Sequence, residues 1–118
     1  GILSSCHKEA RSVLNPSQYD HIRDQVRDLA MQKEPARSVS LDLRAIEDYY
    51  ELRDWGGVLE SLNARLYFHI DQTHRSLILL AFDLKKNNGP TLVGVKQRVR
   101  RRLKHYLKGT YGFLVNTT

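Results

Sequence analysis

Two consecutive segments in the middle of the chain constrain its fold most strongly. Residues 64–71 alternate between two kinds of side chain, as in a half-buried β-strand. One side carries Leu66, Phe68 and Ile70, and the other carries Arg65, Tyr67 and His69. Residues 76–83 form a nearly continuous apolar run, as expected for a central strand covered on both faces. Because only a short turn separates the two segments, they predict an antiparallel β-hairpin, with Arg65, Tyr67 and His69 facing an open surface.

The flanking segments predict helices and one more strand. Residues 7–14 and a segment from Pro16 to about Gln32 predict a helical hairpin, with Asn15 as the N-cap of the second helix and Pro35 beyond its end. Residues 48–53 predict a strand. A final helix carries Val95, Val99, Leu103, Tyr106 and Leu107 on one stripe. This order predicts an α+β fold with helices packed on one side of a small antiparallel sheet, and no strand is predicted between Gly1 and Cys6.

Composition limits the class of protein. A chain of 118 residues with 41% hydrophobic and 27% charged residues is expected to form one globular domain over residues 1–118. No apolar run reaches the roughly 20 residues that a membrane span needs, so no membrane partner is expected. Cys6 is the only cysteine, which excludes an intrachain disulfide and a metal site built from several cysteines of one chain. These features favour a reducing, cytoplasmic location, without a metal or another cofactor.

The positive charge is concentrated near the C-terminus. Seven of the 19 Lys and Arg residues lie from Val95 onward, where no acidic residue occurs, so the rest of the chain holds 12 basic residues against 13 acidic ones. Such asymmetry favours a polyanion or an acidic protein as partner, and the alternative is a solvated helix face. Because Arg100, Arg101 and Arg102 are consecutive, they fan around the helix and cannot all face the core, and we expect this helix to contribute binding more than stability.

Three motifs, in this order, resemble the core of the RelE/ParE superfamily of small bacterial toxins. They are residues 50–53 (Tyr-Glu-Leu-Arg), residues 64–68 (Ala-Arg-Leu-Tyr-Phe) and residues 79–86, which end in Lys85-Lys86. A Gly-Pro turn and a basic final helix follow. The HigB-like branch of the superfamily is the most similar in this arrangement, and the resemblance covers about residues 17–107. It implies a RelE-like fold.

The resemblance also implies ribosome-associated cleavage of messenger RNA. In that reaction the 2′-hydroxyl attacks the adjacent phosphate, and fixed cations stabilise the developing charge without a metal. The catalytic residues it implies are Arg65, Lys85, Lys86, His69 and Glu51. The RNA-binding residues we expect are Arg53, Tyr67, Lys96, Arg98, Arg100, Arg101, Arg102 and Lys104.

Each of these residues also has a simpler interpretation. Arg65 is either the phosphate-binding arginine or a surface arginine paired with Glu51, and Arg53 and Glu51 form either a structural ion pair or a phosphate ligand with a base. His69 either moves protons or is a surface residue. Tyr67 is a stacking or packing ring. Trp55, beside two glycines, is interpreted as loop packing in preference to base stacking.

The implied function is therefore a toxin of a toxin–antitoxin pair, an endoribonuclease (hydrolase) neutralised by a cognate antitoxin in a hetero-oligomer, with mRNA and the ribosome as partners. Two alternatives remain. One is a ParE-like or catalytically inactive member of the same fold that inhibits a protein by binding it. The other is an unrelated basic RNA-binding module.

Overall fold

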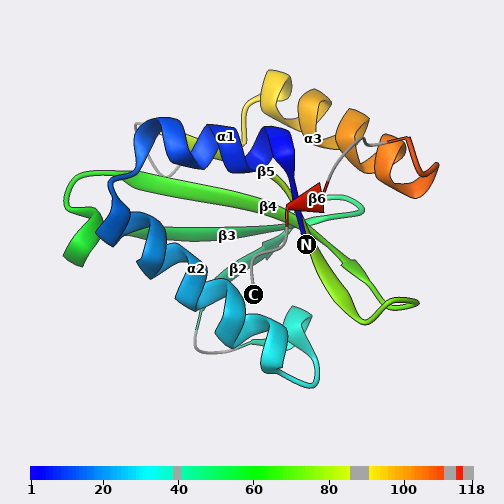
Figure 1. Ribbon diagram of the computed structural model, residues 1–118, viewed down its shortest axis with the longest axis horizontal. Coiled ribbons are helices and arrows are strands. Elements are labelled where there is room, and N and C mark those ends of the chain that lie inside the picture. The colour runs from blue at the N-terminus through cyan, green and yellow to red at the C-terminus, as the bar shows by residue number, and fades with distance from the viewer. Residues whose placement is uncertain (39–40, 86–90, 111–113, 116–118) are drawn as a thin grey trace.

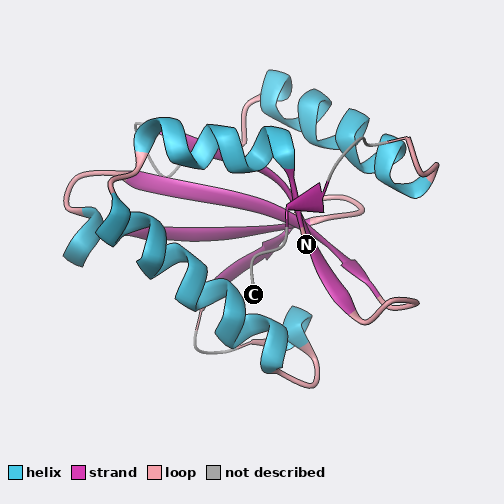
Figure 2. Ribbon diagram, viewed as in Figure 1, coloured by secondary structure: helices cyan, strands magenta, loops and turns pink. Residues whose placement is uncertain are grey.

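The computed structural model describes residues 1–38, 41–85, 91–110 and 114–115. In these ranges the chain forms three helices around a six-stranded sheet (Figures 1 and 2). The helices are α1 (Ser4–Val13), α2 (Pro16–Met31) and α3 (Val93–Leu107), with short 3-10 helices η1 (Pro35–Arg37) and η2 (Gly57–Leu59). The strands are β1 (Ile2–Leu3), β2 (Asp42–Ala45), β3 (Tyr50–Trp55), β4 (Asn63–Asp71), β5 (Ser76–Lys85) and β6 (Leu114–Val115).

The predicted α+β class and the central hairpin are confirmed, but the sheet is mixed. Its strand order is β2-β3-β4-β5-β1-β6. Strands β2, β3, β4 and β5 pair antiparallel with one another, whereas β1 pairs with β5 in parallel and with β6 antiparallel. The sequence gives no convincing strand between Gly1 and Cys6, but Ile2 pairs with Leu79 there and extends the sheet. A strand of two residues is too short to show an alternating pattern.

The helical hairpin begins as the sequence predicts. Asn15 caps α2, since its side chain accepts a hydrogen bond from the Gln18 backbone at 2.9 Å while the Gln18 side chain accepts one from the Asn15 backbone at 3.0 Å. Pro16 is the first helical residue. Both helices cover the sheet face that carries Leu66 and Phe82 (Figure 1), as expected for an N-terminal hairpin packed on one face.

The C-terminal helix covers the opposite face, which corrects the expectation of helices on one side only. Thr91, just before α3, contacts the Tyr67 hydroxyl, and Tyr106, near its end, contacts Asp71. Tyr67 and Asp71 lie on the other side of β4 from Leu66, as strand alternation requires. Of the predicted stripe of α3, Val95, Val99 and Leu103 are buried and Tyr106 is partly buried, whereas the expectation for Leu107 was wrong, because its side chain at the end of the helix is 65% exposed. An apolar stripe shows that a helix packs on a sheet but not on which face.

Candidate functional site

The polar residues of the predicted site lie in three cross-strand rows on the face under α3. Residues opposite one another in neighbouring strands share a face, so the strand register defines each row. The rows are Glu51 with Tyr67, then Arg53 with Arg65 and Asp83, then Trp55 with Asn63 and Lys85. They run from the middle of the sheet to the end where β3 and β5 stop. The predicted residues Glu51, Arg53, Arg65, Tyr67 and Lys85 are thus brought together.

Glu51 is the centre of these rows. Its carboxylate, which has no exposed surface, accepts hydrogen bonds from Arg53 Nε, from Arg65 Nη1 at 3.2 Å and from Thr91 Oγ1 at 2.7 Å. Burial alone would raise the pKa of Glu51, but the hydrogen bonds from Arg53 and Thr91, together with the Arg65 charge, hold it below its usual value. Glu51 is therefore a fixed anion, and a poor proton acceptor at neutral pH.

Arg65 and Tyr67 do not face an open surface, which corrects the prediction made from strand alternation. Both residues have no exposed area, and the Tyr67 hydroxyl donates to Thr91 Oγ1 at 3.4 Å. Burial is the main reason why the pKa of Tyr67 lies above its usual value. The alternation gave the correct side of the strand, but on that side Thr91, two residues before α3, contacts Tyr67 and Glu51. Arg65 pairs with Glu51 as one interpretation held, although inside the protein and not on its surface.

The rows become accessible at their outer end. The Arg53 side chain is 12% exposed and Lys85 is partly exposed, while Trp55 is 68% exposed. The pKa of Lys85 lies below its usual value, first because of desolvation and then because of the Arg65 charge nearby. Its predicted neighbour Lys86 lies outside the described residues. This end offers cations and an aromatic ring to a ligand.

His69 belongs to a different group. It lies four residues beyond Arg65 on β4, a separation of roughly 13 Å along an extended strand. Its ring lies 6.1 Å from that of Tyr106, whose hydroxyl donates to Asp71 at 2.6 Å. Asp71 also binds His74, and these hydrogen bonds, led by that from Tyr106, hold the pKa of Asp71 well below its usual value. The structure therefore does not place His69 with the other predicted catalytic residues.

The basic residues of α3 divide into two sets. Arg98 and Arg102 turn toward α1 and bind Glu9, each with an N–O distance of 2.7 Å, and Arg102 also donates to the Leu80 carbonyl at 2.9 Å. The expectation that all three consecutive arginines serve binding is thus wrong for Arg102, and Arg98 is engaged in the same way. The second set points outward: Arg100, Arg101 and Lys104 are exposed and Lys96 is partly exposed. Arg100 lies 3.5 Å from Glu47, a solvent-exposed pair that contributes little.

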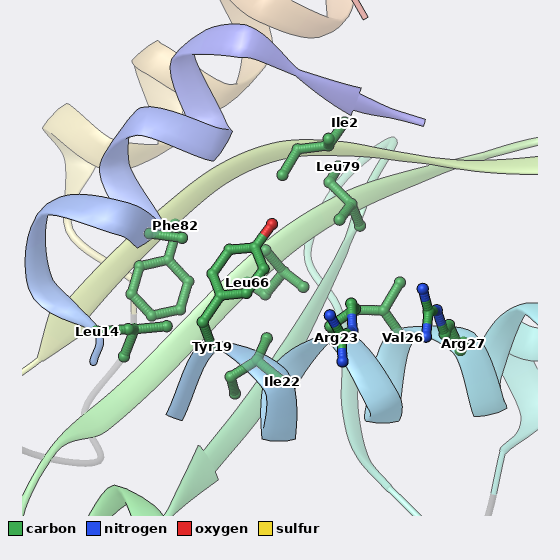
Figure 3. A pocket seen from close by; sticks show the side chains of 11 residues that line it. Ile2, Leu14, Tyr19, Ile22, Arg23, Val26, Arg27, Leu66, Leu79 and Phe82 are labelled. Carbon is green, nitrogen blue, oxygen red and sulfur yellow. The ribbon is translucent and has the colours of Figure 1, made fainter. Parts of the chain in front are cut away.

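A small apolar cavity lies between α2 and the sheet (Figure 3). It encloses about 40 Å³ and is bordered by Leu14, Ile22, Leu66 and Phe82, with Arg23 and Arg27 at its edge (Figure 3). Such a volume holds a few water molecules and is too small for a nucleotide. No cluster of metal-ligating side chains occurs in the described ranges. Within the same ranges, no helix has the length and apolarity needed to cross a bilayer.

Sequence reasoning missed three contributors to this architecture: Thr91, Glu9 and the exposed Trp55. Thr91 and Glu9 are single polar residues with no local pattern, and their partners are 24 or more positions away. Trp55 was interpreted as loop packing because two glycines follow it. No family model, no curated protein and no solved structure matches the chain.

Proposed function

We propose that this chain is the toxin of a toxin–antitoxin pair and cleaves messenger RNA at the outer end of the three rows. The observation that carries the proposal is the convergence of Arg53 and Lys85 beside the buried Glu51–Arg65 pair, on the face that α3 flanks with outward cations. A reducing cytoplasm, an antitoxin partner and action on the ribosome belong to the same proposal, as implied by the resemblance to RelE-type toxins.

The reaction depends above all on stabilisation of the negative charge that develops on the phosphate. The 2′-oxygen forms a bond to the neighbouring phosphorus, its proton leaves, the bond to the 5′-oxygen breaks, and that oxygen takes up a proton. Arg53 and Lys85 are the described cations placed to hold the phosphate while its charge grows. Lys85 is also the group best suited to exchange a proton, because a lowered pKa brings it closer to the working pH.

Arg65 takes a positioning role in this scheme. Its guanidinium has no exposed area, so Arg65 does not contact RNA itself and acts only through the residues that it binds. It fixes Glu51, and Glu51 in turn holds the Arg53 side chain by a hydrogen bond to Nε. A preorganised cation loses little entropy when it meets a phosphate, which is how a buried pair contributes to a surface site.

A second candidate is a binder of the ParE type, with the same fold and no cleavage. The observation that favours it is the separation of His69 from the rows, combined with the low pKa of Glu51, since Lys85 is then the only proton-exchanging group proposed for the site. The basic α3 would then contact protein. A plain RNA-binding module is the third alternative and predicts RNA affinity without toxicity.

Induced expression in a bacterium separates these functions when growth and transcript cleavage are followed together. We expect the wild type to arrest growth and cut transcripts, and Lys85→Ala or Arg53→Ala to lower cleavage by roughly 10²–10³-fold. Lys8→Ala, which removes an exposed cation on α1, is the matched control and should cleave like the wild type. Arrest without cleavage would support the binder, and RNA binding without arrest would support the module.

A further inference from the structure

Trp55 is the one tryptophan of the chain, and its ring lies in solvent. It is 68% exposed, whereas Tyr49 and Tyr67 on the same sheet face are buried. Burial of an aromatic side chain of this size removes some 150–250 Å² from water and ranks among the strongest contributions to a core. Leaving Trp55 outside forgoes that stabilisation, so its exposure is better explained by a ligand than by packing in the folded monomer.

The backbone that carries the ring is nevertheless held firmly. Trp55 is the last residue of β3 and pairs with Asn63 of β4. Its N–H donates to Asp54 Oδ1 at 3.0 Å, and Asp54 Oδ2 is bound by His21 at 2.6 Å and by Gln25 at 2.9 Å, both from α2. Trp55 is thus part of an ordered strand end, and only its side chain projects outward.

The direction of the ring follows from its neighbour. Asp54 faces α2, so Trp55, one residue later, faces the opposite side, where α3 lies. That side is the outermost row, Trp55 with Asn63 and Lys85, next to Arg53. Two strand spacings, roughly 10 Å, separate Trp55 from Lys85 across the sheet. An aromatic face and a cation at this separation match a base and a nearby phosphate of one strand.

We infer that Trp55 is a stacking platform for an unpaired base, so that this site takes single-stranded RNA in preference to duplex RNA; the inference rests on the proposed RNA-directed function. An A-form duplex keeps its base faces stacked on one another, and only an unpaired strand can lay a base on a protein ring. Such stacking tolerates any base, since every base has a π-face. Trp55 then determines which form of RNA binds, while Arg53 and Lys85 hold the backbone.

Because Trp55 is the only tryptophan, its fluorescence reports on the site directly. We expect a short single-stranded oligoribonucleotide to quench the emission of the wild type, and the same sequence annealed into a duplex to quench it much less. By fluorescence polarisation of labelled RNA, Trp55→Ala should weaken single-strand affinity by roughly 5–150-fold, with Trp55→Phe in between. Val58→Ala, which alters an exposed apolar residue of the adjoining η2, is the control and should bind like the wild type.

The outcomes distinguish this inference from the function on which it rests. If labelled RNA binds and is cut, but Trp55→Ala binds it equally well and the wild-type emission is unchanged, the stacking role is overturned and the proposed function stands. Equal quenching by single strand and duplex overturns the strand preference. If the wild type binds no RNA of either form, both proposals fail together, and an exposed Trp55 is then better explained as a protein contact.

Discussion

At the scale of single residues, the Glu51–Arg65 pair decides how variants of the site must be interpreted. Both side chains have no exposed area, and removing one partner of a buried pair leaves an uncompensated charge in the protein interior. We therefore expect Arg65→Ala to destabilise the fold by about 3–5 kcal/mol, measured as the free energy of unfolding in urea. Arg101→Ala, an exposed arginine of α3, should change it by no more than about 0.5 kcal/mol. Equal stability of the two variants would show that Arg65 is solvated.

This prediction differs from the one that the sequence alone supported, in which Arg65 faced an open surface. The sequence did reveal that Glu51 and Arg53 share a side of one strand and that Arg65 lies on the next. It could not reveal that Thr91, 26 positions beyond Arg65 in the numbering, completes the hydrogen bonding of Glu51. Burial of a polar face depends on where a distant element docks, and no local pattern encodes that docking.

At the scale of elements, Glu9 links α1, β5 and α3. Strand β1 ends at Leu3, and Glu9 then supplies the acceptor for the Phe82 N–H at 3.2 Å, while Arg102 donates to the Leu80 carbonyl. Burial would raise the pKa of Glu9, but its hydrogen bonds with Arg102, Phe82 and Arg98 hold it below the usual value. The short strand β1 and the Glu9 side chain together supply hydrogen-bond partners along the edge of β5, where backbone groups would otherwise be unpaired.

The sign of the pH dependence follows from that lowered pKa. A carboxylate whose folded pKa is depressed contributes stability that is present above its unfolded value, about 4.3, and is lost as the pH falls through the folded value. We expect the unfolding free energy to drop as the pH falls below about 4, and Glu9→Gln to show a shallower drop from a lower starting point. At neutral pH the variant should lose about 1.5–3 kcal/mol, the contribution of a hydrogen bond to a charged group.

Amide hydrogen exchange locates the same effect on the structure. In Glu9→Gln the Phe82 amide and the backbone of α3 should exchange faster than in the wild type, because the contact that fastens α3 to α1 is weakened. The amides of β3 and β4, which keep their ladder partners, should accelerate only as far as the lower free energy of global unfolding requires, and they serve as the internal reference. Acceleration of the Phe82 amide and α3 that is no greater than that of β3 and β4 would mean that Glu9 acts on global stability alone.

Element-level reasoning from sequence succeeded where a periodic pattern was long and failed where it was short. The capped α2, the alternating β4 and the stripe of α3 were all foreseen, and each has several repeats of its period. The strands β1 and β2 were not, because two and four residues give no periodic signal. The side of the sheet on which α3 lies also could not be foreseen, although it decides which polar residues are buried.

At the scale of the whole molecule, the net charge is +6, but the basic residues of α3 differ in how far their charge is available to a partner. Arg98 and Arg102 both bind the Glu9 carboxylate, so this group carries fewer counterions to release when RNA arrives than two unpaired arginines would. The outward set, Arg100, Arg101 and Lys104, is solvated and holds counterions that a polyanion can displace. For single strands the logarithm of affinity falls with the logarithm of salt by about 0.7 for each phosphate contacted. The three outward residues together should therefore account for about 2 units of that slope.

The corresponding variant changes Arg100, Arg101 and Lys104 to Ser and leaves Arg102 intact. We expect its RNA affinity at low salt to fall, its salt slope to flatten by about 2, and its melting temperature to stay within a few degrees of the wild type. The matched variant changes Arg98 and Arg102 instead, and should do the reverse: a lowered melting temperature with a nearly unchanged slope for the molecules that remain folded. Measurement of affinity over a range of salt concentrations, with melting curves of the same samples, separates the two. An unchanged slope in the outward variant would assign α3 to a protein partner, since only contact with a polyelectrolyte releases condensed counterions in this way.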